Sequence, residues 1–211
     1  MKALLLFAVS ACSAQSLYMA AIGGVRATDD ITNVTIASKH YVVGPAVEIG
    51  LPLGFSAEVD ALYRREGYQL GFGNFAGSIS MGERANSWEF PILAKYRLPL
   101  RAVKPFLEVG YAPRVISGTI TSDSIVDFTS SGFLPQPVYY HSVEKTSWPV
   151  TQGLVIGGGI GFHVGRLCLS PSLRYTHWNK PAISGYFGDG PSWQSTQEQA
   201  DVLVLIGWRI R

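Results

Sequence analysis

Apolar and polar positions alternate along most of this chain, and the alternation is clearest between residues 88 and 115. From position 88 to position 98 the even-numbered residues are apolar, whereas Glu89, Lys95 and Arg97 stand on the odd-numbered side. A β-strand sends successive side chains to opposite faces, so this segment predicts a strand with an apolar face and a largely charged face. Aromatic residues mark the ends of the apolar face, as in a lipid-facing band with aromatic girdles.

The same alternation predicts eight strands in all. Their approximate bounds are Leu17–Thr28, His40–Leu51, Phe55–Gly67, Trp88–Leu98, Pro105–Val115, Thr151–Val164, Leu167–Trp178 and Ala200–Arg211. Prolines lie in or near several of these strands, where they cannot donate to a hydrogen-bond ladder, so some of them are expected at bulges or strand ends.

The predicted connections are alternately long and short. Tight turns are expected at residues 51–54, 98–104 and 165–166, and irregular loops at residues 29–39, 68–86, 118–150 and 179–199. Short periplasmic turns and long outer loops are typical of a single-chain outer-membrane barrel. With an even number of strands, both ends of the chain lie on the same side of the membrane. The sequence therefore predicts an all-β fold, an eight-stranded up-and-down antiparallel transmembrane β-barrel.

Composition is consistent with this fold class. The chain has 211 residues, which suits one domain. No apolar run reaches the roughly 18 residues of a membrane-spanning helix, and only helices and closed barrels satisfy every backbone group in lipid. The net charge of +2 argues against a nucleic-acid partner.

The first residues predict an export signal. Lys2 supplies the positive charge, residues 3–9 form the apolar core, and Cys12-Ser-Ala14 is a small-residue cleavage site. The expected organisation is a signal peptide at residues 1–14 and a barrel domain at residues 15–211. A lipobox reading, in which Cys12 is lipidated, remains open. After cleavage only Cys168 is left, which excludes an internal disulfide.

The run Trp88-Glu-Phe-Pro-Ile-Leu-Ala-Lys-Tyr-Arg-Leu98 resembles the central strand of the small, porin-like outer-membrane β-barrel domain proteins of Gram-negative bacteria. The resemblance is one of architecture and pattern, and it covers most of the chain after residue 16. It implies a protein of the bacterial outer membrane, in contact with outer-membrane lipid.

Charged residues collect on the faces predicted to point inward. The interior of an eight-stranded barrel is just wide enough for side chains to fill it, and buried charges are tolerated when they are paired. We therefore expect a network of ion pairs that plugs the lumen and leaves no general pore; a narrow polar path is the alternative. The expected members are Glu48, Glu58, Asp60, Glu89, Lys95, Arg97, Glu108, Arg114, Arg174 and Arg209.

Candidate chemistry is sparse. None of the four histidines has metal-ligand spacing with another His, Cys or acid, so no metal and no cofactor are predicted. His141, Ser142 and Glu144 invite a hydrolase interpretation, as does His177, because some eight-stranded outer-membrane enzymes deacylate lipid A. A nucleophile must lie within hydrogen-bond reach of a positioned base, and adjacent positions in one loop do not provide this. The sequence predicts that the protein is not an enzyme.

Aromatic residues in the predicted outer loops are a possible recognition surface, or else they pack over the barrel mouth. They are Tyr139, Tyr140, Trp148, Tyr186, Phe187 and Trp193. The predicted function is a monomeric outer-membrane barrel with a structural or surface-interaction role, in which an extracellular ligand or protein binds the loops. The alternatives are a lipid-modifying enzyme and a soluble lipocalin-like carrier, whose charges would lie outside and whose apolar groups would line a cavity.

Overall fold

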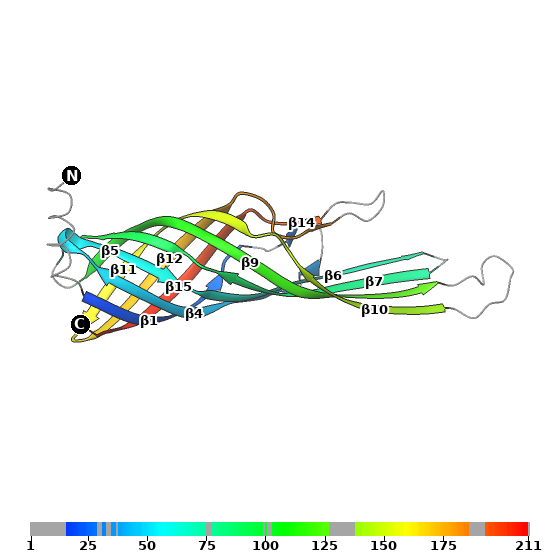
Figure 1. Ribbon diagram of the computed structural model, residues 1–211, viewed down its shortest axis with the longest axis horizontal. Helices are drawn as coiled ribbons and strands as arrows, with labels where there is room; N and C mark the ends of the chain where they lie inside the picture. Colours follow the sequence, from blue (N-terminus) through cyan, green and yellow to red (C-terminus); the bar gives the residue numbers. More distant parts are fainter. Residues whose placement is uncertain are drawn as a thin grey trace, which may run out of the picture.

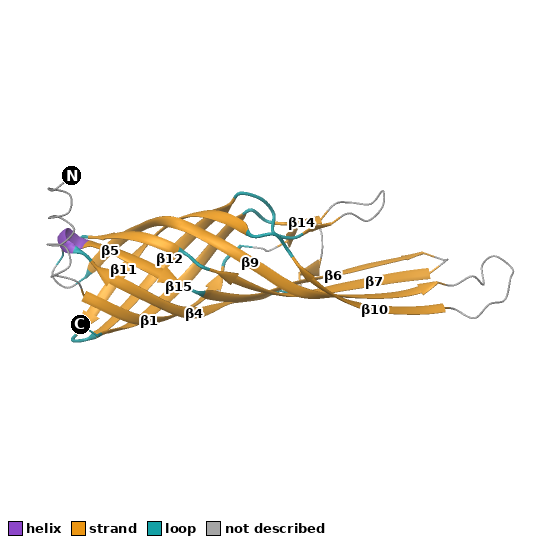
Figure 2. Cartoon of the chain, viewed as in Figure 1, coloured by secondary structure: helices purple, strands orange, loops and turns teal. Residues whose placement is uncertain are grey.

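The computed structural model describes residues 16–28, 31–32, 35–36, 38–74, 77–98, 100, 103–126, 138–185 and 193–210. Almost all of them lie in β-strands (Figure 2). The strands that build the wall are β1 (Ser16–Arg26), β4 (Lys39–Gly50), β5 (Phe55–Asp60), β6 (Leu62–Asn74), β7 (Gly77–Glu89), β8 (Ile92–Arg97), β9 (Lys104–Val126), β10 (Val138–Ser147), β11 (Thr151–Val164), β12 (Leu167–Trp178) and β15 (Glu198–Arg209). The short strands β2 (Ile31–Thr32), β3 (Thr35–Ile36), β13 (Ser184–Gly185) and β14 (Trp193–Ser195) lie outside the main wall or at its edge, and Pro52–Gly54 form one 3-10 turn.

The wall closes on itself as an antiparallel barrel of eight strands (Figure 1). Three wall strands are each built from two segments in line, namely β5 with β6, β8 with β7, and β10 with β11. Strand β15 pairs with β1, and β9 pairs with β11, which completes the ring. The predicted fold class is therefore confirmed.

The breaks in the wall strands coincide with prolines. Pro45 lies where β4 changes partner from β5 to β6, and its carbonyl accepts a hydrogen bond from the amide of Ala61 at 3.0 Å. Pro91 lies between β7 and β8, and its carbonyl accepts from the amide of Asp60 at 3.0 Å. Because proline has no N–H to donate, both residues stand where the regular ladder is interrupted, as expected for barrel prolines.

Within the membrane-spanning part of the wall, side chains alternate between the lumen and the outside. On β9, for example, Leu107 and Val109 are exposed while Phe106 and Glu108 are buried. Aromatic rings gather at two levels of the apolar exterior. Tyr63 and Trp88 are 5.2 Å apart at one level, and at the other Phe55 and Tyr96 are 4.9 Å apart. These are the girdles of a transmembrane barrel. Among the described residues, no helix is long and apolar enough to cross a membrane.

The two ends of the barrel differ in shape (Figure 1). At the short-turn end, β1 begins and β15 ends, and Gly54 and Gly165 adopt positive φ angles of 83° and 61° in tight turns. At the opposite, hairpin end, residues 67–74, 77–86, 117–126 and 138–147 continue as a four-stranded projecting sheet, in the order β6-β7-β9-β10.

The projecting sheet corrects the prediction of irregular loops at residues 68–86 and 118–150. Strands β6, β7, β9 and β10 run through most of both stretches. The cause is solvation. Many side chains on both faces of this sheet contact water, so serine, threonine and charged residues replace the apolar half of the pattern. Backbone pairing holds the strands together all the same, because the preference for a strand depends on cross-strand neighbours more than on burial alone.

Candidate functional site: a charge-filled lumen under a hairpin sheet

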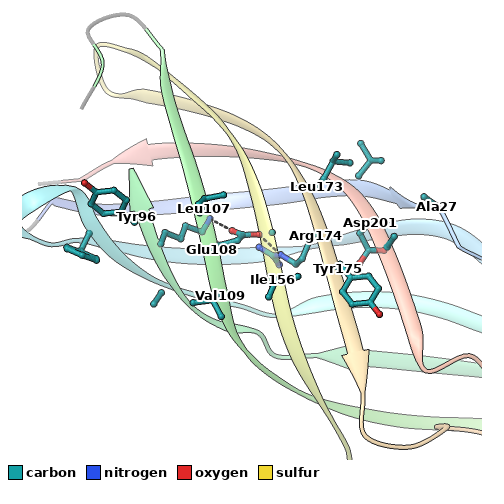
Figure 3. A pocket seen from close by; sticks show the side chains of 16 residues that line it. Ala27, Tyr96, Leu107, Glu108, Val109, Ile156, Leu173, Arg174, Tyr175 and Asp201 are labelled. Carbon is teal, nitrogen blue, oxygen red and sulfur yellow. Dashed lines mark hydrogen bonds and ion pairs between the residues drawn. The ribbon is translucent and has the colours of Figure 1, made fainter. Parts of the chain in front are cut away.

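Five ionic side chains from four wall segments, β5, β8, β9 and β12, meet in the lumen and form the inner network. The Arg174 guanidinium on β12 donates to Glu108 at 2.9 Å, to Asp60 at 2.8 Å and to Glu58 at 3.3 Å. Lys95 on β8 lies 2.6 Å from Glu58 and 3.1 Å from Glu108. Figure 3 shows the ion pair between Glu108 and Arg174 amid the apolar side chains of the wall. Two cations thus hold three carboxylates from the neighbouring and facing walls.

A second pair extends this network toward the short-turn end. The Arg97 guanidinium donates to both carboxylate oxygens of Glu48 and, at 2.8 Å, to the Ser56 hydroxyl. The ring of Phe106 lies beneath both cations, with its centroid 4.9 Å from Lys95 Nζ and 5.7 Å from Arg97 Cζ. The bidentate geometry and the aromatic face both favour arginine at position 97.

Nearer the hairpin end, Arg64, Glu89, Gln199 and Asp201 form the outer network. Arg64 makes two hydrogen bonds to the Asp201 carboxylate, at 2.8 and 2.6 Å, and its Nε lies 2.9 Å from Glu89. The Gln199 amide donates to Asp201 at 2.9 Å and to Glu89 at 3.2 Å. All four residues are almost fully buried, so this network, like the inner one, occupies the lumen.

Arg114 is placed differently from the other lumen cations. Its guanidinium lies 3.8 Å above the ring of Trp178 and donates to the Thr151 hydroxyl at 3.0 Å. Arg26 lies 3.8 Å from Glu66 at the same end of the barrel. Stacking on an indole and donating to a neutral oxygen satisfy this buried guanidinium only in part, because Arg114 Nη2 has no hydrogen-bond partner among the described residues.

Apolar side chains close the hairpin end of the lumen. The lid cluster consists of the buried residues Tyr68, Ala85, Ile116, Ala182 and Ile183. The segment that carries Ala182 and Ile183 is held over the mouth because both of their amides donate to the Ser195 hydroxyl, at 2.7 and 3.2 Å. Trp148 packs against the cluster from the side.

Glu83 is a titratable group of the hairpin end. It lies on β7 five positions beyond Trp88, outside the apolar belt, and its side chain faces the lid cluster. Burial raises the pKa of Glu83 to about 7, and the nearby negative charge of Glu66 adds to this effect. Burial likewise raises the pKa of Tyr68, its direct cross-strand neighbour.

The structure places most of the expected lumen residues inside the barrel. Eight are buried, namely Glu48, Glu58, Asp60, Glu89, Lys95, Glu108, Arg114 and Arg174. Arg97 is half-buried. Arg209 is the exception: as the last residue of β15 it lies at the rim of the short-turn end, where its side chain is exposed rather than packed in the lumen.

Other lumen residues were missing from the expected set. Arg64 and Asp201 stand at inward positions of the predicted strands, so the alternation alone could have identified them. Glu66 likewise stands at an inward position of the predicted strand Phe55–Gly67. Glu83 lies in the stretch predicted to be a loop, and only the pairing of β7 with β6 turns it inward.

The expected surface aromatics divide into two groups. Tyr139 and Tyr140 are 72% and 59% exposed on the projecting sheet, whereas Trp148 is half-buried against the lid cluster. Tyr186 and Phe187 lie outside the described residues, as does the side chain of Trp193. The predicted signal peptide and Cys12 also lie outside the described residues, and both stay predictions.

The residues considered for hydrolysis do not assemble as a triad. His141 Nδ1 lies 2.6 Å from Asp123 on the neighbouring strand, on an exposed face of the projecting sheet. Ser142 follows His141 in the strand, so its side chain points to the other face. His177 is exposed on β12 among outward positions. Within the described part of the chain, no group of His, Cys, Asp and Glu could hold a metal ion.

Among the described residues, the exterior carries a large apolar hollow of about 750 Å³ over β8, β9, β11, β12 and β15. Leu107, Val109, Leu173 and Tyr175 are among the residues that line it (Figure 3). It lies within the apolar belt, so its surroundings are lipid chains.

Comparisons with known proteins agree with this fold. No family model and no curated protein matches the chain. Among solved structures it is similar to a major outer membrane protein from Thermus thermophilus, with a TM-score of 0.51 and 10% identity over 93% of this chain and 100% of that one. Neisserial surface protein A follows with a TM-score of 0.47 and 13% identity over 94% and 100%. Ail, the attachment invasion locus protein of Yersinia pestis, has a TM-score of 0.43 and 9% identity over 92% and 97%.

The fold and the exterior together define the class. The chain is a small eight-stranded transmembrane β-barrel of the bacterial outer-membrane type. Its girdles and apolar belt suit the outer membrane of a Gram-negative bacterium. The soluble lipocalin-like alternative is wrong in its facing, because the charges lie inside and the apolar side chains outside.

Proposed function

We propose that this protein is a closed, monomeric outer-membrane barrel that acts by contact with molecules outside the cell, and that it neither catalyses a reaction nor serves as a general pore. In this proposal the short-turn end faces the periplasm and the projecting sheet faces outward, as in barrels whose long connections are extracellular.

The observation that carries the proposal is the filling of the lumen. Arg174 by itself forms ion pairs with three carboxylates, those of Glu58, Asp60 and Glu108. All four side chains are nearly inaccessible to solvent. Opening a path would separate buried ion pairs, and breaking one such pair costs about 3–5 kcal/mol. Beyond the networks, the lid cluster covers the mouth. A lumen packed in this way supports a non-conducting barrel.

The projecting sheet supports a contact role. Its outermost strand, β10, pairs only with β9 among the described strands, so one edge of β10 offers free backbone groups. Tyr139, Tyr140 and Val143 on this strand are all at least 59% exposed. Exposed edge strands with apolar side chains are templates for another extended chain, which adds to the sheet by backbone hydrogen bonds.

Two measurements on the full chain test the proposal. In planar bilayers the protein should give no conductance steps, and regular steps would overturn the closed lumen. In panning with a random peptide library, sequences should be enriched on the wild type and lost on a variant that lacks residues 119–124 and 139–144. The deletion removes equal lengths from the paired strands β9 and β10. Equal enrichment on both proteins, or none on either, would overturn the contact role of the sheet.

A further inference from the structure

Basic side chains form a band on the outside of the hairpin end, immediately beyond the aromatic girdle. We call Lys39, Arg65, Arg84 and Lys145 the basic collar. All four are exposed, and they lie on β4, β6, β7 and β10, which with β9 are consecutive around the wall. Lys39 is in register with Arg65. Arg84 and Lys145 are both in register with Thr119 of β9.

The height of the collar follows from the strand positions. Arg65 lies two positions beyond Tyr63, and Lys39 two beyond Tyr41, which is roughly 7 Å along a strand. Arg84 lies four positions beyond Trp88. The residue between them on that face, Asn86, accepts a hydrogen bond from the Tyr63 hydroxyl at 2.7 Å. Girdle aromatics lie at the level of lipid headgroups, so the collar stands at the headgroup layer or at its outer edge.

The charges in this part of the molecule are sorted by face. Outward positions of the collar strands beyond the girdle carry four basic residues and, among described residues, one acid, Asp123, whose carboxylate is engaged by His141. The inward positions of the same segments carry Glu66, Glu83 and Glu144. No carboxylate of the described residues forms a hydrogen bond or ion pair with a collar side chain. A surface that serves only solubility mixes positive and negative side chains, whereas the collar side chains are all positive and lie at one height on the barrel.

We propose that the basic collar binds the phosphate groups of a phosphorylated lipid in the outer leaflet. The collar lies beside the membrane, faces the lipid rather than the lumen, and carries the sign that phosphates require. Arginine and lysine are the side chains that bind phosphate, and a basic residue at an anionic membrane surface contributes about 1 kcal/mol. The inference rests on the proposed orientation, because it needs the hairpin end to lie at the outer leaflet.

The test compares two pairs of substitutions in the full chain, purified in a neutral detergent. One variant carries Arg65→Gln and Arg84→Gln. Its matched control carries Lys104→Gln and Arg166→Gln, which remove the same charge at the short-turn end. Native mass spectrometry would measure the dissociation constant of diphosphorylated lipid A and of the same lipid after removal of both phosphates.

We expect the collar variant to bind the phosphorylated lipid on the order of tenfold more weakly than the wild type, and the control to bind as the wild type does. A second variant, Arg65→Lys with Arg84→Lys, should keep most of the affinity. Inorganic phosphate at the same phosphorus concentration should not displace the lipid. Equal binding of both lipids, equal loss in the control, or displacement by inorganic phosphate would overturn the proposal.

Failure here is distinguishable from failure of the proposed function. The conductance and panning measurements use the wild type and the sheet deletion, and neither includes a collar substitution. A collar that binds no phosphorylated lipid leaves a closed barrel with a peptide-binding sheet intact, whereas conductance steps in the wild type would remove the closed barrel and leave lipid binding unchanged.

Discussion

Arg174 Nη1 lies 2.8 Å from Asp60 Oδ2, although the two residues are 114 positions apart and their strands, β12 and β5, are not neighbours in the wall. The pair therefore spans the lumen and ties two facing walls together. Arg174 also holds Glu58 and Glu108, so it is the residue on which most of the inner network depends.

Replacing Arg174 by Met should destabilise the barrel by about 3–5 kcal/mol, because three buried carboxylates lose their main counter-charge. Urea unfolding in lipid vesicles, followed by tryptophan fluorescence, measures the change. The exposed Arg166 on the tight turn is the control, and Arg166→Met should leave the unfolding midpoint unchanged. A midpoint for Arg174→Met equal to that of the wild type would contradict an energetic role for the network.

Arg64 and Asp201 should behave as one unit in the outer network. Because Arg64 makes two hydrogen bonds to the Asp201 carboxylate in a buried site, the substitutions Arg64→Met and Asp201→Asn should show a coupling energy of about 1–3 kcal/mol in a double-mutant cycle of unfolding free energies. The cycle of Arg64→Met with Arg166→Met, two sites that share no partner, should be additive. Additivity for Arg64 and Asp201 would show that the pair contributes nothing as a pair.

Glu83 should make stability depend on pH. Its pKa is about 7 in the folded protein and near 4.5 in the unfolded chain, so the folded state binds the proton more tightly. The free energy of unfolding should then be highest below pH 4.5, fall as pH rises to about 7, and stay level above it.

Glu83→Gln should remove this component of the pH dependence and should be more stable than the wild type at pH 8. The measurement is urea unfolding at pH 5 and pH 8. Glu144→Gln, at an exposed position of β10, serves as the control and should follow the wild-type curve. An unchanged slope in Glu83→Gln would show that other groups carry the dependence.

Ile92 and Tyr139 separate lipid exposure from water exposure. Both side chains are more than half exposed, at 55% and 72%, but Ile92 lies midway between the girdle residues Trp88 and Tyr96, whereas Tyr139 lies on the projecting sheet. Ile92→Arg should cost about 2–4 kcal/mol of unfolding free energy in a bilayer, as for a charge on the lipid face near the midplane. Tyr139→Arg should change it by less than about 0.5 kcal/mol. Equal changes in unfolding free energy for the two variants would contradict the assignment of one residue to lipid and the other to water.

Two glycines provide a steric comparison within the wall. A Cβ on Gly110 would come within 2.0 Å of the Ile92 carbonyl oxygen, whereas one on Gly23 would meet nothing within 4 Å. Gly110→Ala should therefore force the β8–β9 pair apart and cost about 1–3 kcal/mol, while Gly23→Ala should be tolerated. The fraction of protein that resists SDS before heating gives the comparison. If Gly110→Ala resists SDS as well as the wild type does, the strands β8 and β9 accommodate the extra methyl group without a loss of stability.

The amino-acid sequence by itself determined the number of wall strands, their facing and the alternation of short and long connections. Each of these is a local property, because the two-residue repeat of a strand indicates which side chains contact lipid and which point into the lumen. The facing of Leu107 and Glu108, for instance, follows from their parity alone. The same local record predicted most of the inward charges, including Glu58, Lys95 and Arg174.

Only the tertiary structure decided which of these charges meet. The partner of Arg174 depends on the register of every strand between β5 and β12, and register is a sum of pairings that no single segment encodes. The projecting sheet and the basic collar were decided in the same way. Where both faces of a strand contact water, neither face needs apolar side chains, so apolar and polar residues do not alternate in the sequence. Backbone pairing between distant segments then brings Arg65, Arg84 and Lys145 onto one face.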